Sequence, residues 1–74
     1  MNKVIIYVGA MTYAIKLRKM LARAGIESRQ VKSLENDGCT HGVEIMYHDF
    51  YGAIAVLRES GMEYSVQESK NDLS

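Results

Sequence analysis

The sequence predicts an α+β fold, a ferredoxin-like βαββαβ domain with one four-stranded antiparallel sheet and two helices on one face. Two observations predict it. Two stretches with helical spacing of apolar residues each lie between two extended stretches. A seven-residue segment at the end of the first helical stretch also recurs in the second half of the chain. Two such β-α-β units with interleaved strands form a sheet of this kind.

The recurring segment is the clearest sign of an internal duplication. Residues 21–27, Leu-Ala-Arg-Ala-Gly-Ile-Glu, correspond to residues 57–63, Leu-Arg-Glu-Ser-Gly-Met-Glu. In both copies a glycine stands where a helix is expected to end, and glycine adopts the left-handed conformation of that position without a Cβ clash. Chance similarity is the alternative, because Leu-x-x-x-Gly is common at helix ends.

The predicted elements follow from local patterns. Val4–Val8 is β-branched and aromatic, and we expect a strand buried on both faces. A helix follows between Thr12, its expected cap, and Ala24, and the second helix begins at Asp49 or His48. The other strands are expected at residues 27–32, 43–47 and 64–67, with Val43, Ile45 and Tyr47 on one side of their strand. We expect one domain over residues 1–68 and a flexible polar tail over residues 69–74.

Composition narrows the function classes. Nine basic and nine acidic residues give a formal net charge of zero, so we expect no nucleic-acid partner. The longest apolar-leaning stretch, residues 4–14, is too short to span a bilayer, and we expect no membrane partner. One cysteine cannot form an internal disulfide and fits a reducing compartment, which favours a cytoplasmic protein. Near-zero charge also does little to keep copies apart, so a homodimer is one option.

Cys39 is the one residue whose chemistry suggests a site. It lies near the end of a turn-rich segment, residues 33–42, which we expect to be a loop. Gly38 and Gly42 would shape this loop and allow backbone N–H groups to face the sulfur and stabilise a thiolate. His41, two residues away, would tune the thiol as a cation or a base. The alternative for Cys39 is a small buried core residue, and for His41 a solvated loop residue.

Other kinds of site have less support. Cys39 and His41 supply only two potential metal ligands and His48 a distant third, whereas a structural zinc site takes four, so we expect no metal and no cofactor. A metal site shared between two copies is the alternative. Tyr13, Tyr47 and Tyr51 cluster around the helix starts and would border a binding surface or pack at the sheet edge. No catalytic set is recognisable in so small a chain, and we expect no stand-alone enzyme.

Several of these features together resemble a known family. They are the strand, the helix that runs from Thr12 and ends in Leu-x-x-Ala-Gly-Ile, the Gly38-Cys39 pair before the third strand, and the second helix that ends in Leu-x-x-Ser-Gly-Met. This arrangement, over residues 3–68, resembles the selenium/sulfur carrier-like family of small bacterial proteins. The resemblance implies a ferredoxin-like domain in a bacterial cytoplasm that holds selenium or sulfur on its cysteine, which is Cys39 in this sequence.

Two functions therefore stand side by side as hypotheses. The first is a thiol-based carrier that holds sulfur or selenium on Cys39, with donor and acceptor proteins as its partners. The second is a non-catalytic module that binds a ligand or a partner and regulates it, with a dimer that pairs through sheet edges as one option. The two differ in whether Cys39 is required.

Overall fold

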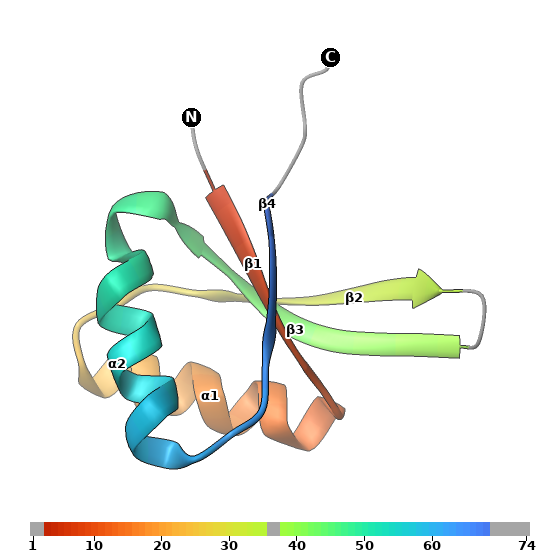
Figure 1. Ribbon diagram of the computed structural model, residues 1–74, viewed down its shortest axis with the longest axis horizontal. Coiled ribbons are helices and arrows are strands. Elements are labelled where there is room, and N and C mark those ends of the chain that lie inside the picture. The colour runs from red at the N-terminus through yellow and green to blue at the C-terminus, as the bar shows by residue number, and fades with distance from the viewer. Residues whose placement is uncertain (1–2, 36–37, 69–74) are drawn as a thin grey trace.

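The computed structural model describes residues 3–35 and 38–68. Along these residues the elements run, in order, as strand β1 (Lys3–Gly9), helix α1 (Met11–Arg23), strands β2 (Arg29–Glu35) and β3 (Gly38–Met46), a 3₁₀ helix η1 (Tyr47–Asp49), helix α2 (Phe50–Ser60) and strand β4 (Ser65–Glu68). The result is an α+β fold with one open sheet and two helices (Figure 1).

All strand pairs in the sheet are antiparallel. The strand order is β2-β3-β1-β4, so β1 lies between β3 and β4, and β2 and β4 form the two edges. Val4 is opposite Ile45 and Ile6 is opposite Val43, while β4 places Val66 on the other side of Ile6. The register changes between Tyr7 and Gly9 of β1, where the ladder with β3 is irregular.

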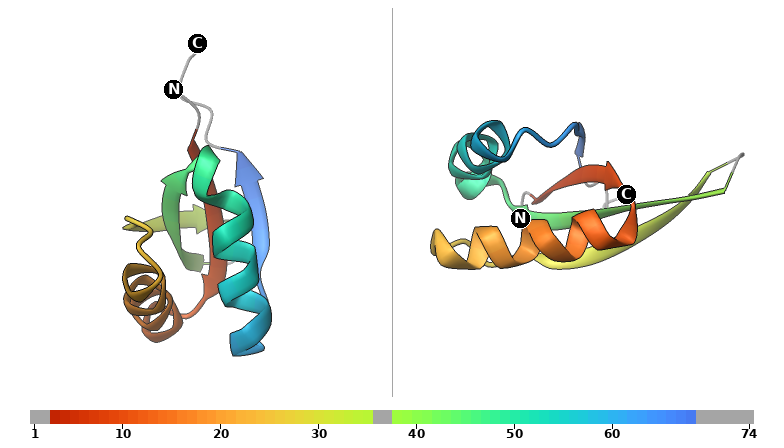
Figure 2. Two further views of the ribbon diagram at one scale, coloured as in Figure 1. Left: turned by 90° about the vertical axis from the view of Figure 1, so that its left-hand side faces the viewer. Right: turned by 90° about the horizontal axis from the view of Figure 1, so that it is seen from below.

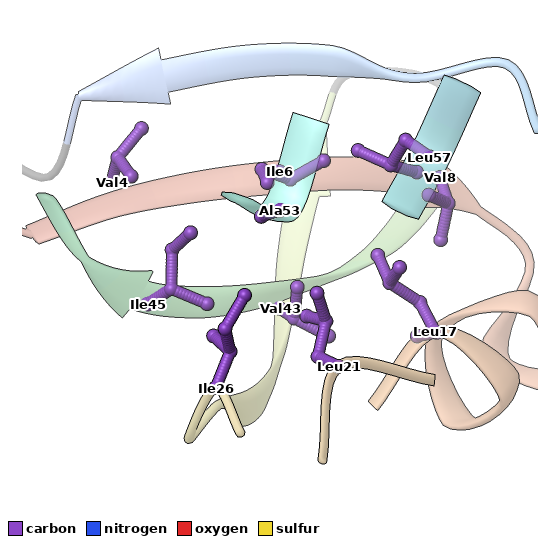
Figure 3. Packing of buried hydrophobic residues seen from close by; sticks show 11 residues of the cluster. Val4, Ile6, Val8, Leu17, Leu21, Ile26, Val43, Ile45, Ala53 and Leu57 are labelled. Atoms are coloured by element: carbon purple, nitrogen blue, oxygen red, sulfur yellow. The ribbon is translucent and has the colours of Figure 1, made fainter. Parts of the chain in front are cut away.

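Both helices lie on the same side of the sheet (Figure 2). Side chains from that side and from the inner faces of the helices form one core: Val4, Ile6, Val8, Ala14, Leu17, Leu21, Ile26, Val43, Ile45, Ala53 and Leu57 (Figure 3). The helical spacing that predicted the helices is therefore the spacing of their buried residues. The expectation that β1 is buried on both faces is wrong, because Ile5 and Tyr7 face the open side of the sheet and are only partly buried.

The two repeated helix ends share a left-handed glycine. Gly25 has φ +81° and Gly61 has φ +76°. After α1 the Ile26 N–H donates to the Leu21 carbonyl at 2.8 Å and the Gly25 N–H to the Ala22 carbonyl at 3.0 Å, which is the Schellman arrangement. The Gly61 N–H donates to the Leu57 carbonyl at 3.0 Å. The prediction that glycine ends both helices is confirmed.

The start of α1 differs from the expectation, whereas α2 begins as expected, directly after Asp49. The N-cap of α1 is Ala10 rather than Thr12, and Asp49 occupies the N-cap position of α2 without a hydrogen bond from its side chain to the helix. Strand β3, which precedes α2, also ends one residue earlier than expected, at Met46. Tyr47 lies in η1 with 48 % of its surface exposed, instead of continuing the buried row of Val43 and Ile45.

The segment expected to be a loop is a β-hairpin. β2 continues to Glu35 and β3 begins at Gly38, so most of residues 33–42 pair with each other. Backbone pairing between the two strands outweighs the turn-forming tendency of the individual residues, which acts only locally. The expected tail, residues 69–74, lies outside the described residues. Neither helix described over residues 3–35 and 38–68 has the length and apolar character needed to cross a bilayer.

Candidate functional site

Cys39 is the second residue of β3. Its backbone is opposite Leu34 of β2, and Gly38 is opposite Glu35. The side chain of Cys39 lies outside the described part of the structure. The backbone alone thus places the cysteine in the hairpin strand next to the connection between β2 and β3, not in a long loop.

The hairpin extends beyond the helices. In Figure 1 the paired ends of β2 and β3 run to the side opposite α2, and Figure 2 shows them reaching past the first turn of α1. Strand position 39 therefore belongs to an arm that projects from the body of the domain. A projecting arm is a suitable position for a residue that must meet another protein.

His41 follows two residues later and lies at the base of the arm. Its backbone is paired with Lys32 of β2 on one side and with Gly9 of β1 on the other. The side chain is partly buried, and its Nδ1 atom is fully buried without a hydrogen-bond partner in the described part of the chain. A buried ring nitrogen without a partner is unusual, because most buried polar atoms are hydrogen-bonded.

Gly42 has a structural task in the strand. It is buried, and a Cβ added there would meet the backbone of β1, with the Tyr7 Cα 2.8 Å away and the Ile6 carbonyl oxygen closer still. Only glycine permits this close approach of the two strands, next to the irregular pairing between Tyr7 and Gly9. Gly42 thus holds β3 against β1 at the point where the arm leaves the sheet.

The third potential metal ligand is far along the strand from the other two. His48 lies in η1, beyond the opposite end of β3, and its Nε2 is 3.5 Å from Oδ2 of Asp49. Within residues 3–35 and 38–68, no group of three or more His, Cys, Asp or Glu side chains is placed to hold a metal ion. His48 is 74 % exposed and forms a local pair at the start of α2.

Two of the three tyrosines expected near helix starts come together. Tyr47 stacks on Phe50 with ring centroids 6.0 Å apart, and Tyr51 meets Phe50 edge-on at 5.4 Å. Tyr51 is 78 % exposed. Tyr13 lies at the start of the other helix and is also exposed. The aromatic group of Tyr47, Phe50 and Tyr51 is thus a second surface feature, separate from the arm.

The sequence alone did not reveal an ion cluster on the open side of the sheet. The side chain of Glu44 is only 11 % exposed, and its Oε1 accepts a hydrogen bond from Nη2 of Arg29 at 2.9 Å and lies 4.0 Å from Nζ of Lys3. The three residues come from β3, β2 and β1 and border a cavity of about 220 Å³. Only the strand register brings them together, so no local sequence signal could have identified them.

Neither the family models nor the curated proteins include one that matches this chain.

Proposed function

We propose that this chain is a ferredoxin-like carrier domain that holds a sulfur or selenium atom on Cys39 for delivery to a partner protein. The element order βαββαβ and the strand order β2-β3-β1-β4 support the ferredoxin-like assignment. The single observation that carries the function is the placement of backbone position 39 in the projecting arm of β2 and β3. The role is that of a substrate-carrying protein, not an enzyme.

The loading step is a thiol exchange. The Cys39 thiolate attacks the terminal sulfur of a persulfide on the donor, a new S–S bond forms on Cys39, and the donor's S–S bond breaks. The donor cysteine leaves as a thiolate, so no external oxidant or reductant is needed. Delivery is the same exchange in reverse, towards an acceptor thiol. A selenium atom is carried by the equivalent Se–S chemistry.

Intact mass measurement tests the proposal. The protein is incubated with a cysteine desulfurase and isotope-labelled cysteine, and we expect the mass of one labelled sulfur atom on the wild type and none on Cys39→Ser. Thr40→Ser, a conservative change at the neighbouring position in β3, is the matched control and should load fully. An unmodified wild-type mass, with the desulfurase active towards another thiol, would exclude the carrier role.

His41 is proposed as the residue that tunes the thiol. Its position two residues from Cys39 and its buried Nδ1 without a partner in the described residues support this role. The rate of Cys39 alkylation by iodoacetamide reports the thiolate fraction across pH. His41→Gln should move the midpoint of this rate profile, whereas a purely structural histidine would lower stability and leave the midpoint unchanged.

A second candidate function is a binding module that regulates a partner. The observation that favours it is the pair of exposed tyrosines, Tyr47 and Tyr51, that pack on the partly buried Phe50, since aromatic side chains are enriched in interfaces. This function would persist in Cys39→Ser and be lost in Tyr51→Ala. The carrier function, in contrast, would be lost in Cys39→Ser and would persist in Tyr51→Ala.

A further inference from the structure

The zero net charge conceals a strong separation of charge along the chain. Residues 1–34 contain seven lysines and arginines and one acidic residue, whereas residues 35–74 contain two basic and eight acidic residues. The two halves therefore carry formal charges of +6 and −6. Strands from the two halves alternate in the sheet, and Lys3 and Arg29 lie beside Glu44, so what matters for a partner is the charge left on each surface.

Helix α1 carries much of the positive charge. Its basic residues Lys16, Arg18, Lys19 and Arg23 are all exposed, and the helix contains no acidic residue. We call these four residues the basic face. Lys16, Lys19 and Arg23 are spaced by three and four residues and form a row opposite the buried row of Leu17 and Leu21.

The basic face has no partner within the part of the chain that the structure describes. The ion pairs found among residues 3–35 and 38–68 involve Lys3, Arg29 and His48, and none of the four cations of α1. The outer side of α1 is not covered by another element (Figure 2). Four cations on one helix without an ion pair among the described residues repel each other, and an acidic partner would relieve that repulsion.

Carboxylates border the row on the side of α2. Arg23 and Glu59 line the same cavity of about 410 Å³ between the helices, and Lys16 and Glu63 line another of about 380 Å³. A long polyphosphate backbone crossing α1 would meet these acidic residues. A protein surface, in contrast, can match a basic row and its acidic border with charges of the opposite sign. The arrangement therefore favours a protein over a nucleic acid.

We propose that the basic face of α1 is the docking surface for an acidic surface of the sulfur donor. This inference rests on the proposed carrier function. The position of α1 supports it, because the helix begins at Met11, two residues after Gly9, which pairs with His41 at the base of the arm. A donor docked along α1 therefore lies next to β3 and would reach Cys39 beyond the first turn of the helix, where the arm projects.

Sulfur loading by two donors tests the docking surface. A cysteine desulfurase must dock, whereas inorganic polysulfide reacts without docking. We expect the triple variant Lys16→Glu/Lys19→Glu/Arg23→Glu to lower the second-order rate of desulfurase loading about tenfold or more at low salt, and to leave polysulfide loading unchanged. Arg58→Glu, at an exposed basic residue of α2, is the charge-reversal control and should load normally.

The outcomes separate the two proposals. If neither the desulfurase nor polysulfide loads sulfur onto the wild type, the carrier function itself is overturned. Normal desulfurase loading of the triple variant, with polysulfide loading intact, overturns only the docking surface. Binding of a labelled twelve-nucleotide RNA to the wild type at physiological salt, lost in the triple variant, would assign the basic face to nucleic acid and also overturn the inference. Far-ultraviolet circular dichroism confirms that each variant is folded.

Discussion

Gly42 of β3 and Tyr7 of β1 are paired so closely that a Cβ at position 42 would come within 2.8 Å of the Tyr7 Cα. The contact is between two backbones, and neither can move away as a side chain can. It fixes the distance between the central strands at the base of the arm. Gly42 therefore links the stability of the sheet to the placement of the segment that contains Cys39.

Gly42→Ala should destabilise the domain by about 1–3 kcal/mol, the usual cost of overpacking. Urea denaturation followed by circular dichroism measures this. Gly52→Ala is the matched control, because position 52 is inside α2 and a Cβ there would meet only the end of the Ile26 side chain, at 3.2 Å. We expect this control to be neutral or stabilising by up to about 1 kcal/mol, since alanine favours helix over glycine. Equal effects of the two substitutions would contradict the close approach.

Gly25→Ala and Gly61→Ala should each cost about 1–2 kcal/mol. Both positions have positive φ, and neither has an atom within 4 Å of an added Cβ, so the cost is backbone strain alone. Asparagine tolerates this conformation better, and Gly25→Asn and Gly61→Asn should recover part of the loss. Thermal unfolding of the four variants measures the differences. Alanine variants as stable as the wild type would show that the left-handed helix ends are not required.

The helices were predictable from the sequence because their signals are local. Leu17 and Leu21 show the spacing of a buried helix face, and glycine ends each helix, as expected. Ala24, the expected last residue of the first helix, is instead the exposed C-cap, because the helix ends one residue before it. Spacing identifies the buried face but not the last residue of the helix.

The sheet was less predictable because its signals are non-local. The segment Val-Ile-Ile-Tyr-Val has no polar residue to reveal alternation, so the partly exposed Ile5 and Tyr7 could not be distinguished from the buried Ile6. Turn-forming residues flank Cys39, so the sequence favours a loop where the structure has a hairpin. Only pairing with β2 makes them strand residues. The separation of basic and acidic residues along the chain, in contrast, can be counted from the sequence alone, although the net charge of zero does not reveal it.

Leu17→Ala should destabilise the protein by about 2–5 kcal/mol, the usual range for a buried leucine. Leu17 is fully buried in the core between α1 and the sheet. Ile15 of the same helix is 37 % exposed, and Ile15→Ala should cost less than Leu17→Ala. Chemical denaturation of both variants makes the comparison. Similar losses of stability in the two variants would show that α1 does not pack against the sheet through the face that contains Leu17.

The pair of Arg29 and Glu44 should contribute little free energy despite its short distance. The Arg29 side chain is 74 % exposed, so solvent screens its interaction with Glu44, and exposed pairs are worth about 0–1 kcal/mol. Glu44→Ala should cost more than Arg29→Ala, because the Glu44 side chain is 11 % exposed and its carboxylate also lies near Lys3, so that its removal affects three strands. A double-mutant cycle at low and high salt measures the coupling. A coupling above about 2 kcal/mol that is insensitive to salt would show that the pair is shielded from water and contradict the screening argument.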